Sequence, residues 1–125
     1  MEKVTVCAEG APAAIGPYAQ AIRTGNVIYT SGQLGIDPAT GELAGDIEAQ
    51  THAAIQNLER VLKAGGAGLQ DVVKTTVFVK DLADFAVVNA VYGSYFREGF
   101  PARSCIQAAA LPKGGLVEIE CVAVL

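Results

Sequence analysis

Charged side chains and a thiol alternate with apolar residues in two stretches near the C-terminal end of the chain. The stretches are Pro-Ala-Arg-Ser-Cys-Ile-Gln over residues 101–107 and Leu-Val-Glu-Ile-Glu-Cys-Val over residues 116–122. Such alternation predicts strands, which place Arg103 and Cys105 on one face of the first stretch. Glu118 and Glu120 likewise share a face of the second. Burying a guanidinium or a carboxylate among apolar residues is costly unless it is paired or meets a ligand, so we expect chemistry here.

A turn signal, Pro-Lys-Gly-Gly over residues 112–115, separates the two stretches. We therefore expect the two strands to form a hairpin. One face of the resulting sheet should then carry Arg103, Cys105, Glu118 and Glu120. Because that face is half polar and half apolar, it is a natural subunit interface.

The elements that must position these side chains predict an α+β domain spanning residues 1–125. Strands are expected over residues 4–7, 19–23, 27–31 and 72–80, and helices over 47–64 and from 82 onward, capped by Asp46 and Asp81. This order of elements predicts a single-layer mixed β-sheet with two helices packed on one face.

Composition excludes several classes of protein. The chain is 51% hydrophobic and only 18% charged, yet it has no apolar run of the ~18 residues that span a membrane, so we expect a homo-oligomer that buries the excess. A net charge of −4 without a Lys/Arg cluster argues against nucleic acid as a partner. The three cysteines lack a CxxC pair, so neither a disulfide framework nor a zinc site is indicated. The first residues lack the apolar core of a signal peptide, which predicts a cytoplasmic protein.

Other candidate residues have two interpretations each. Tyr18 could pack or be presented to a site, and Ser31 and Gly32 at a strand end could make a turn or donate hydrogen bonds to an anion. Asn89 lies within the apolar stripe of the second helix, where it either ties down a neighbouring segment or faces a ligand. The lone histidine, His52, is expected to face solvent without a catalytic role.

Four blocks in this order resemble the RidA (YjgF) family of reactive-intermediate imine deaminases. They are Ala-Ile-Gly-Pro-Tyr-Ala-Gln-Ala over 14–21, Thr-Ser-Gly-Gln over 30–33, Val-Lys-Thr-Thr-Val-Phe-Val-Lys-Asp-Leu over 73–82, and Pro-Ala-Arg-Ser-Cys with the later Leu-Pro and Val-Glu-Ile. The resemblance implies a chorismate-mutase-like fold and a homotrimer whose sheets wall a central barrel, with one site in each cleft between subunits. It also implies that Tyr18, Ser31, Gly32 and Asn89 lie at the substrate site. Residues 96–100 look slightly shorter than the matching loop of many members, which would alter the cleft rim.

The reaction implied is hydrolysis of 2-imino acids and their enamines, such as 2-iminobutanoate, 2-iminopropanoate and 2-aminoacrylate, to 2-oxo acids and ammonia. Arg103 would bind the substrate carboxylate with its planar fork of donors, and Glu118 would activate water. Cys105 would line the substrate site without acting as a nucleophile, because no histidine is available as its base. No metal or organic cofactor is expected.

Other functions remain open at this point. Some members of the family have been described as endoribonucleases or translation inhibitors. A module that binds a small carboxylate ligand, or a holdase, would present much the same residues. By fold analogy alone, a chorismate-mutase-type rearrangement is a further alternative.

Overall fold

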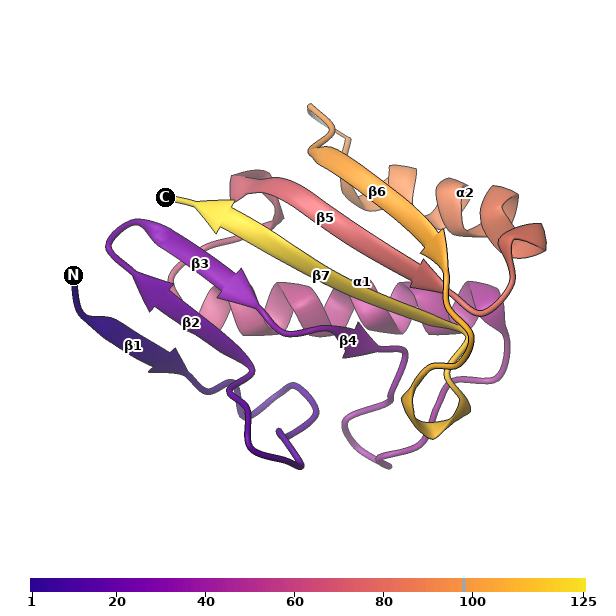
Figure 1. Ribbon diagram of the computed structural model, residues 1–125, viewed down its shortest axis with the longest axis horizontal. Coiled ribbons are helices and arrows are strands. Elements are labelled where there is room, and N and C mark those ends of the chain that lie inside the picture. Colours follow the sequence, from indigo (N-terminus) through magenta and orange to yellow (C-terminus); the bar gives the residue numbers. More distant parts are fainter. Residues whose placement is uncertain (98) are drawn as a thin grey trace.

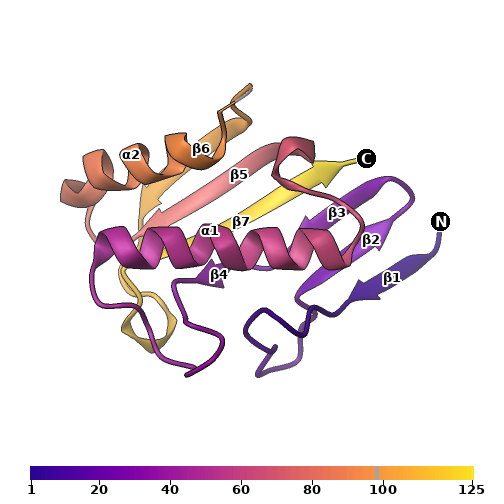
Figure 2. The ribbon, with the colours of Figure 1, turned by 180° about the vertical axis from the view of Figure 1, so that it is seen from behind.

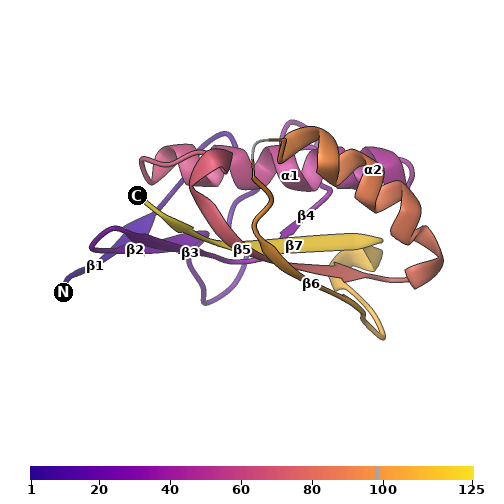
Figure 3. The same ribbon diagram turned by 90° about the horizontal axis from the view of Figure 1, so that it is seen from above.

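One mixed sheet carries both helices on a single face, as Figure 3 shows. The computed structural model describes residues 1–97 and 99–125. The loop over residues 96–100, which was expected to be slightly shorter than in many members of the family, includes Glu98, which lies outside the described residues. The strands are β1 (Lys3–Val6), β2 (Ala21–Thr24), β3 (Val27–Thr30), β4 (Gln33–Leu34), β5 (Val72–Val79), β6 (Ala102–Gln107) and β7 (Val117–Val124). The helices are α1 (Ile47–Ala64) and α2 (Phe85–Tyr95), with short 3-10 turns at Leu69–Asp71, Leu82–Asp84 and Pro112–Gly114. The predicted α+β fold with two helices on one sheet face is confirmed.

Helix α1 forms as its sequence predicts and lies along the sheet (Figure 2). Asp46 caps it by accepting a hydrogen bond from the amide of Ala49 at 2.8 Å. Its apolar stripe packs under the sheet with no exposed surface at Ile55, Leu58, Val61 and Leu62. The chain leaves the helix through Gly65 and then Gly66, whose φ of +91° is a conformation that favours glycine.

Helix α2 begins later than predicted, because Asp81 caps the 3-10 turn that precedes it. The Asp81 carboxylate accepts from the amide of Ala83, and the helix proper starts at Phe85. Val88 and Tyr92 are buried against the sheet as expected. Phe85 is 39% exposed, so the apolar stripe is shorter at its start than the spacing indicated. Among residues 1–97 and 99–125, no helix combines the length and apolar character of a membrane span.

Strand β5 separates the two C-terminal strands, so the predicted hairpin of β6 and β7 is wrong. The strand order is β1-β2-β3-β7-β5-β6, with β4 pairing to β7, and Figure 1 shows β5 between the other two. Strand β6 runs parallel to β5 and forms an edge of the sheet, because the chain reaches it from β5 through α2. Alternation and turn residues are the same for a tight hairpin and for a loop that passes around an intervening strand. Local signals therefore could not decide between them.

The register also divides the predicted set of charged residues between two faces. Arg103 pairs with Thr75 on β5, which pairs with Cys121 on β7, and both partners are buried beneath the helices. Glu118 pairs with Phe78, which pairs with Ile106, and this row lies on the face that the helices leave open. The prediction that Arg103 and Cys105 share a face with Glu118 and Glu120 is therefore wrong. Within one chain, the arginine and the glutamate point to opposite sides of the sheet.

Candidate active site

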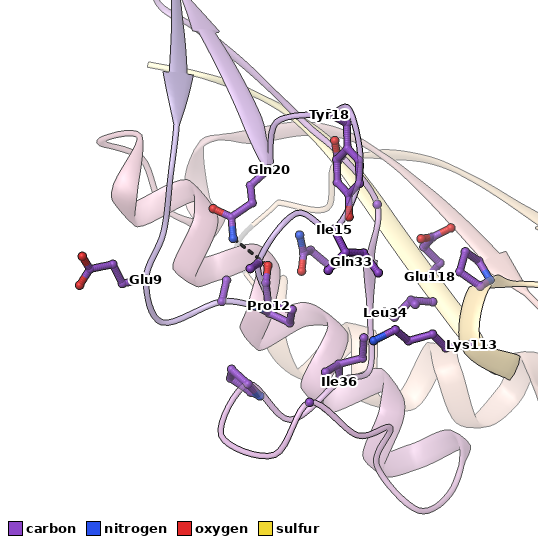
Figure 4. Close-up of a pocket in the computed structure, with 17 residues that line it drawn as sticks. Glu9, Pro12, Ile15, Tyr18, Gln20, Gln33, Leu34, Ile36, Lys113 and Glu118 are labelled. Atoms are coloured by element: carbon purple, nitrogen blue, oxygen red, sulfur yellow. Dashed lines mark hydrogen bonds between the residues drawn. The ribbon is translucent and has the colours of Figure 1, made fainter.

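Two clusters hold the predicted site residues. The first, the Glu118 pocket, comprises Tyr18, Ser31, Gly32, Lys113 and Glu118 around a cavity of about 640 Å³ (Figure 4). The second, the Arg103 cluster, comprises Phe85, Asn89, Tyr92, Arg103 and Cys105 where α2 lies over the edge strand. The structure thus gathers every predicted site residue into one of two places, and it adds Lys113, Phe85 and Tyr92.

Buried side chains fix the loop that forms one wall of the Glu118 pocket. Gln20 is 4% exposed, and its amide nitrogen donates to the Pro12 carbonyl at 2.7 Å while its oxygen accepts from the amide of Ala8. The hydroxyl of Ser31 donates to the carbonyl of Ala19 at 2.7 Å. Both contacts hold the segment that ends in the half-exposed Tyr18. Gln20 was not predicted as a site residue, although a glutamine among small apolar residues at the start of a strand is a signal for such a role.

Gly32 is the residue that leaves room for the Glu118 side chain. A Cβ at position 32 would lie 2.7 Å from the carboxyl carbon of Glu118 and 2.9 Å from its Oε2. Strand β4 continues directly from Gly32, and its Leu34 pairs with Glu118 on β7. The glycine backbone is therefore in close contact with the carboxylate, which no other residue type would permit without displacing it.

Burial raises the pKa of Glu118, and the neighbouring carboxylate of Glu120 raises it further. Both residues lie on the open face of β7, two positions apart. The Lys113 side chain extends into the same cavity from the loop before β7 (Figure 4). Its backbone has a φ of 59°, the one positive value at a non-glycine residue within the described part of the chain. A carboxylate with a raised pKa accepts a proton more readily than an exposed one, which suits it to act as a general base.

Arg103 is held by contacts from helix α2. Its Nη1 donates to the side-chain oxygen of Asn89 at 2.7 Å, and its guanidinium carbon lies 4.9 Å from the ring centre of Tyr92 and 5.4 Å from that of Phe85. The sequence left open whether Asn89 ties down a neighbouring segment or faces a ligand. In the structure its side-chain oxygen accepts a hydrogen bond from Arg103, so Asn89 holds a charged side chain that is itself a candidate for ligand binding. Aromatic rings lie against the guanidinium, and among residues 1–97 and 99–125 only Asn89 accepts a hydrogen bond from it, so its other donors can meet a planar anion.

Two other predicted residues have different surroundings. Burial raises the pKa of the Cys105 thiol, with Arg103 opposing the shift, which makes this thiol a poor nucleophile at neutral pH. His52 is partly exposed, and its Nδ1 lies 2.8 Å from the hydroxyl of Tyr95, a contact that joins α1 to α2. No group of three His, Cys, Asp or Glu side chains within residues 1–97 and 99–125 is placed to hold a metal ion.

The sheet, its helices and the two clusters define a small α+β protein of the chorismate-mutase-like fold class. The family model described as Endoribonuclease L-PSP matches residues 8–125. The chain belongs to this family, which is also called RidA or YjgF, and the resemblance found in its sequence is confirmed.

Known relatives agree over nearly the full length of the chain. The 2-iminobutanoate/2-iminopropanoate deaminase of Escherichia coli strain K12 is 51% identical over 123 residues, with 96% of each chain covered. The crystal structure of RidA from an Antarctic Psychrobacter species is 47% identical, with a TM-score of 0.95 and with 98% of this chain and 99% of that chain covered. The structure of Escherichia coli TdcF with bound serine is 41% identical, with a TM-score of 0.95 and 98% of each chain covered.

Proposed function

We propose that this protein hydrolyses 2-imino acids and their enamine tautomers to 2-oxo acids and ammonia, with 2-iminobutanoate and 2-iminopropanoate as the substrates. The observation that carries the proposal is the Glu118 carboxyl, which has a raised pKa and is seated against Gly32 in a cavity of about 640 Å³. Support comes from the Escherichia coli relative, which is 51% identical and bears the name of this activity.

The chemistry needs an anchor for the substrate and a group that exchanges protons with water. The Arg103 guanidinium binds the substrate carboxylate with two parallel hydrogen bonds. Glu118 takes a proton from a water molecule while the oxygen of that water bonds to C2 of the protonated imine. The product of this step is a tetrahedral amino alcohol. The protonated Glu118 then returns a proton to the amino group. As the C–N bond breaks, Glu118 accepts the hydroxyl proton, so that ammonia and the 2-oxo acid are formed, and this proton passes from Glu118 to the departing ammonia. Tyr18, Ser31 and Gly32 shape the pocket around this centre.

Assembly is part of the proposal, because one chain presents Arg103 and Glu118 on opposite faces of its sheet. We propose a homotrimer in which the Arg103 cluster of one copy meets the Glu118 pocket of the next. The open face also carries large apolar side chains that a monomer would leave in water, including Tyr29 at 52% and Ile106 at 49% exposure. The protein acts in the cytoplasm as a single catalytic domain.

Mixing two inactive variants tests both the activity and the assembly. Arg103→Ala and Glu118→Gln homotrimers are each expected to lack activity, which is followed as loss of 2-iminobutanoate generated in place by an amino-acid oxidase. After the two are unfolded together and refolded at equal amounts, about a quarter of the clefts combine an intact Arg103 with an intact Glu118 from different copies. Activity should return to about that fraction of wild type. Refolded single variants are the control, and a mixture as inactive as its components would contradict a site shared between copies.

Gly32→Ala is expected to lower kcat by about a hundredfold, because the new Cβ would push the Glu118 carboxyl away from the water that it activates. Thermal unfolding should change little, since the group that must move is the end of a flexible side chain. Ala13→Gly, at another residue that lines the pocket, is a control of similar size. A Gly32→Ala protein with wild-type kcat would show that the position of Glu118 does not matter.

Glu120→Gln is expected to shift the pH dependence of kcat/KM. Glu118 acts in its ionised form, so activity falls as the pH drops through the pKa of Glu118, which burial and Glu120 both raise. Removing the Glu120 charge lowers that pKa, and the acid limb of the profile should move to lower pH. An unchanged acid limb would show that another group controls it.

A further inference from the structure

Tyr92 connects Arg103 to the interior of the domain. Its side chain is 4% exposed, and its hydroxyl lies 2.8 Å from the Thr75 hydroxyl, which is fully buried on β5. The Phe96 ring lies against it with ring centres 4.5 Å apart and an angle of 31° between the planes. The Tyr92 ring is therefore fixed at its tip by a hydrogen bond and on its side by packing.

Thr75 is also the strand neighbour of Arg103, since the two residues pair in the register of β5 and β6. The hydrogen bond between Thr75 and Tyr92 thus joins the strand beside Arg103 to the helix above it. The guanidinium carbon lies 4.9 Å from the centre of the Tyr92 ring, within the range of a cation–π contact. The ring of Phe85 lies further away, with its centre 5.4 Å from the same carbon, and this residue is 39% exposed and has no hydroxyl to fix it.

An arginine side chain has several rotatable bonds and loses much conformational freedom when it binds a ligand. The fixed ring of Tyr92 limits the orientations of the Arg103 guanidinium before a ligand binds. Asn89 limits them further, because its side-chain oxygen accepts from Nη1 of Arg103 at 2.7 Å. Burial raises the pKa of Tyr92, so its hydroxyl stays protonated. The ring therefore meets the Arg103 guanidinium as a neutral aromatic face and does not form an ion pair with it. Arg103 keeps its charge available for the substrate.

We propose that Tyr92 is a positioning residue whose ring face aims the Arg103 guanidinium at the substrate carboxylate. This inference rests on the proposed function, because it assigns Tyr92 a part in recognising the same carboxylate. It makes the Tyr92 ring face, not its hydroxyl, the feature that substrate affinity depends on.

Four variants separate positioning from stability. Tyr92→Leu keeps apolar bulk but removes the ring, and we expect KM for 2-iminobutanoate to rise about tenfold with kcat changed less than about threefold. The double variant Tyr92→Phe with Thr75→Val keeps the ring and replaces both hydroxyls, so that no buried polar group is left unpaired, and its KM should stay near wild type. Thr75→Val alone leaves the Tyr92 hydroxyl buried without this partner and should give an intermediate KM. Val88→Ala removes part of a fully buried apolar side chain in the same helix, so it lowers stability, and it should leave KM unchanged.

A second readout does not depend on turnover. The Arg103 side-chain NH resonance should show an upfield ring-current shift in NMR spectra of the wild type and the double variant, and should lose most of it in Tyr92→Leu. Arg103→Lys identifies the signal. Hydrolysis by the wild type with unchanged KM in Tyr92→Leu, or an equal rise in Val88→Ala, would overturn the inference. Absence of imine hydrolysis by the wild type, with the ring-current shift present, would instead overturn the proposed function.

Discussion

Replacing Arg103 with alanine is expected to lower kcat/KM for 2-iminobutanoate hydrolysis by about a thousandfold. Losing a charge-assisted, two-point contact to a carboxylate costs about 4 kcal/mol, which corresponds to that factor. The substitution also leaves Asn89 without the guanidinium that it accepts from. Steady-state kinetics with an imine generated in place would measure the loss, and circular dichroism would establish that the variant is folded.

Two other substitutions, one beside Arg103 and one in the Glu118 pocket, serve as controls for Arg103→Ala. Cys105→Ala should keep most of the activity, because burial raises the pKa of this thiol and the proposed mechanism gives it no part in making or breaking a bond. An equally severe loss in both variants would support covalent catalysis by the thiol. Lys113→Ala removes the cation that lines the Glu118 pocket itself. If it abolished binding while Arg103→Ala did not, the substrate carboxylate would lie on Lys113.

Replacing Glu118 with glutamine is expected to lower kcat by about a thousandfold, within the range for loss of a general base. KM should change little, because glutamine keeps the volume and hydrogen-bonding reach of the side chain. Rapid-quench measurement of 2-oxobutanoate formation would separate the chemical step from product release. Glu120→Gln, on the same face of the same strand, should keep most of its activity at neutral pH.

The stability of the Glu118→Gln variant should respond in the opposite direction to its activity. The pKa of Glu118 is raised on folding, so its favourable contribution is present below the unfolded pKa and is lost as the pH rises through the folded pKa. At neutral pH the ionised carboxylate therefore opposes folding, and Glu118→Gln should unfold at the same temperature as wild type or a higher one. A markedly less stable variant would mean that the carboxylate has structural partners that it needs.

Much of the fold follows from local patterns. The capping aspartate and apolar stripe predicted α1, and alternation correctly divided β7 into a buried face and an open one. Alternation shows which side chains of one strand share a face, but it does not show which strand lies beside it. The relation of Arg103 to Glu118 depended on β5 lying between their strands, and that arrangement is set by the crossover through α2.

The site shows the same limit. Gly32 reads locally as a turn residue, and its importance depends on Glu118, which is 86 positions away in the numbering of the chain and adjacent to it in space. Asn89 and Tyr92 occupy helix positions typical of core packing, and their partner is an arginine on an edge strand. Pairwise contacts of this kind come from tertiary packing, which no single stretch of sequence encodes.

The opposite orientation of Arg103 and Glu118 has a consequence for how the protein would behave at low concentration. A separated chain would hold only half of each proposed centre, so specific activity should decline on dilution below the dissociation constant of the assembly. Mutations far from either cluster would then act as catalytic mutations whenever they weaken association. Selection for turnover would preserve the contacts between copies as strictly as it preserves the side chains that meet the substrate.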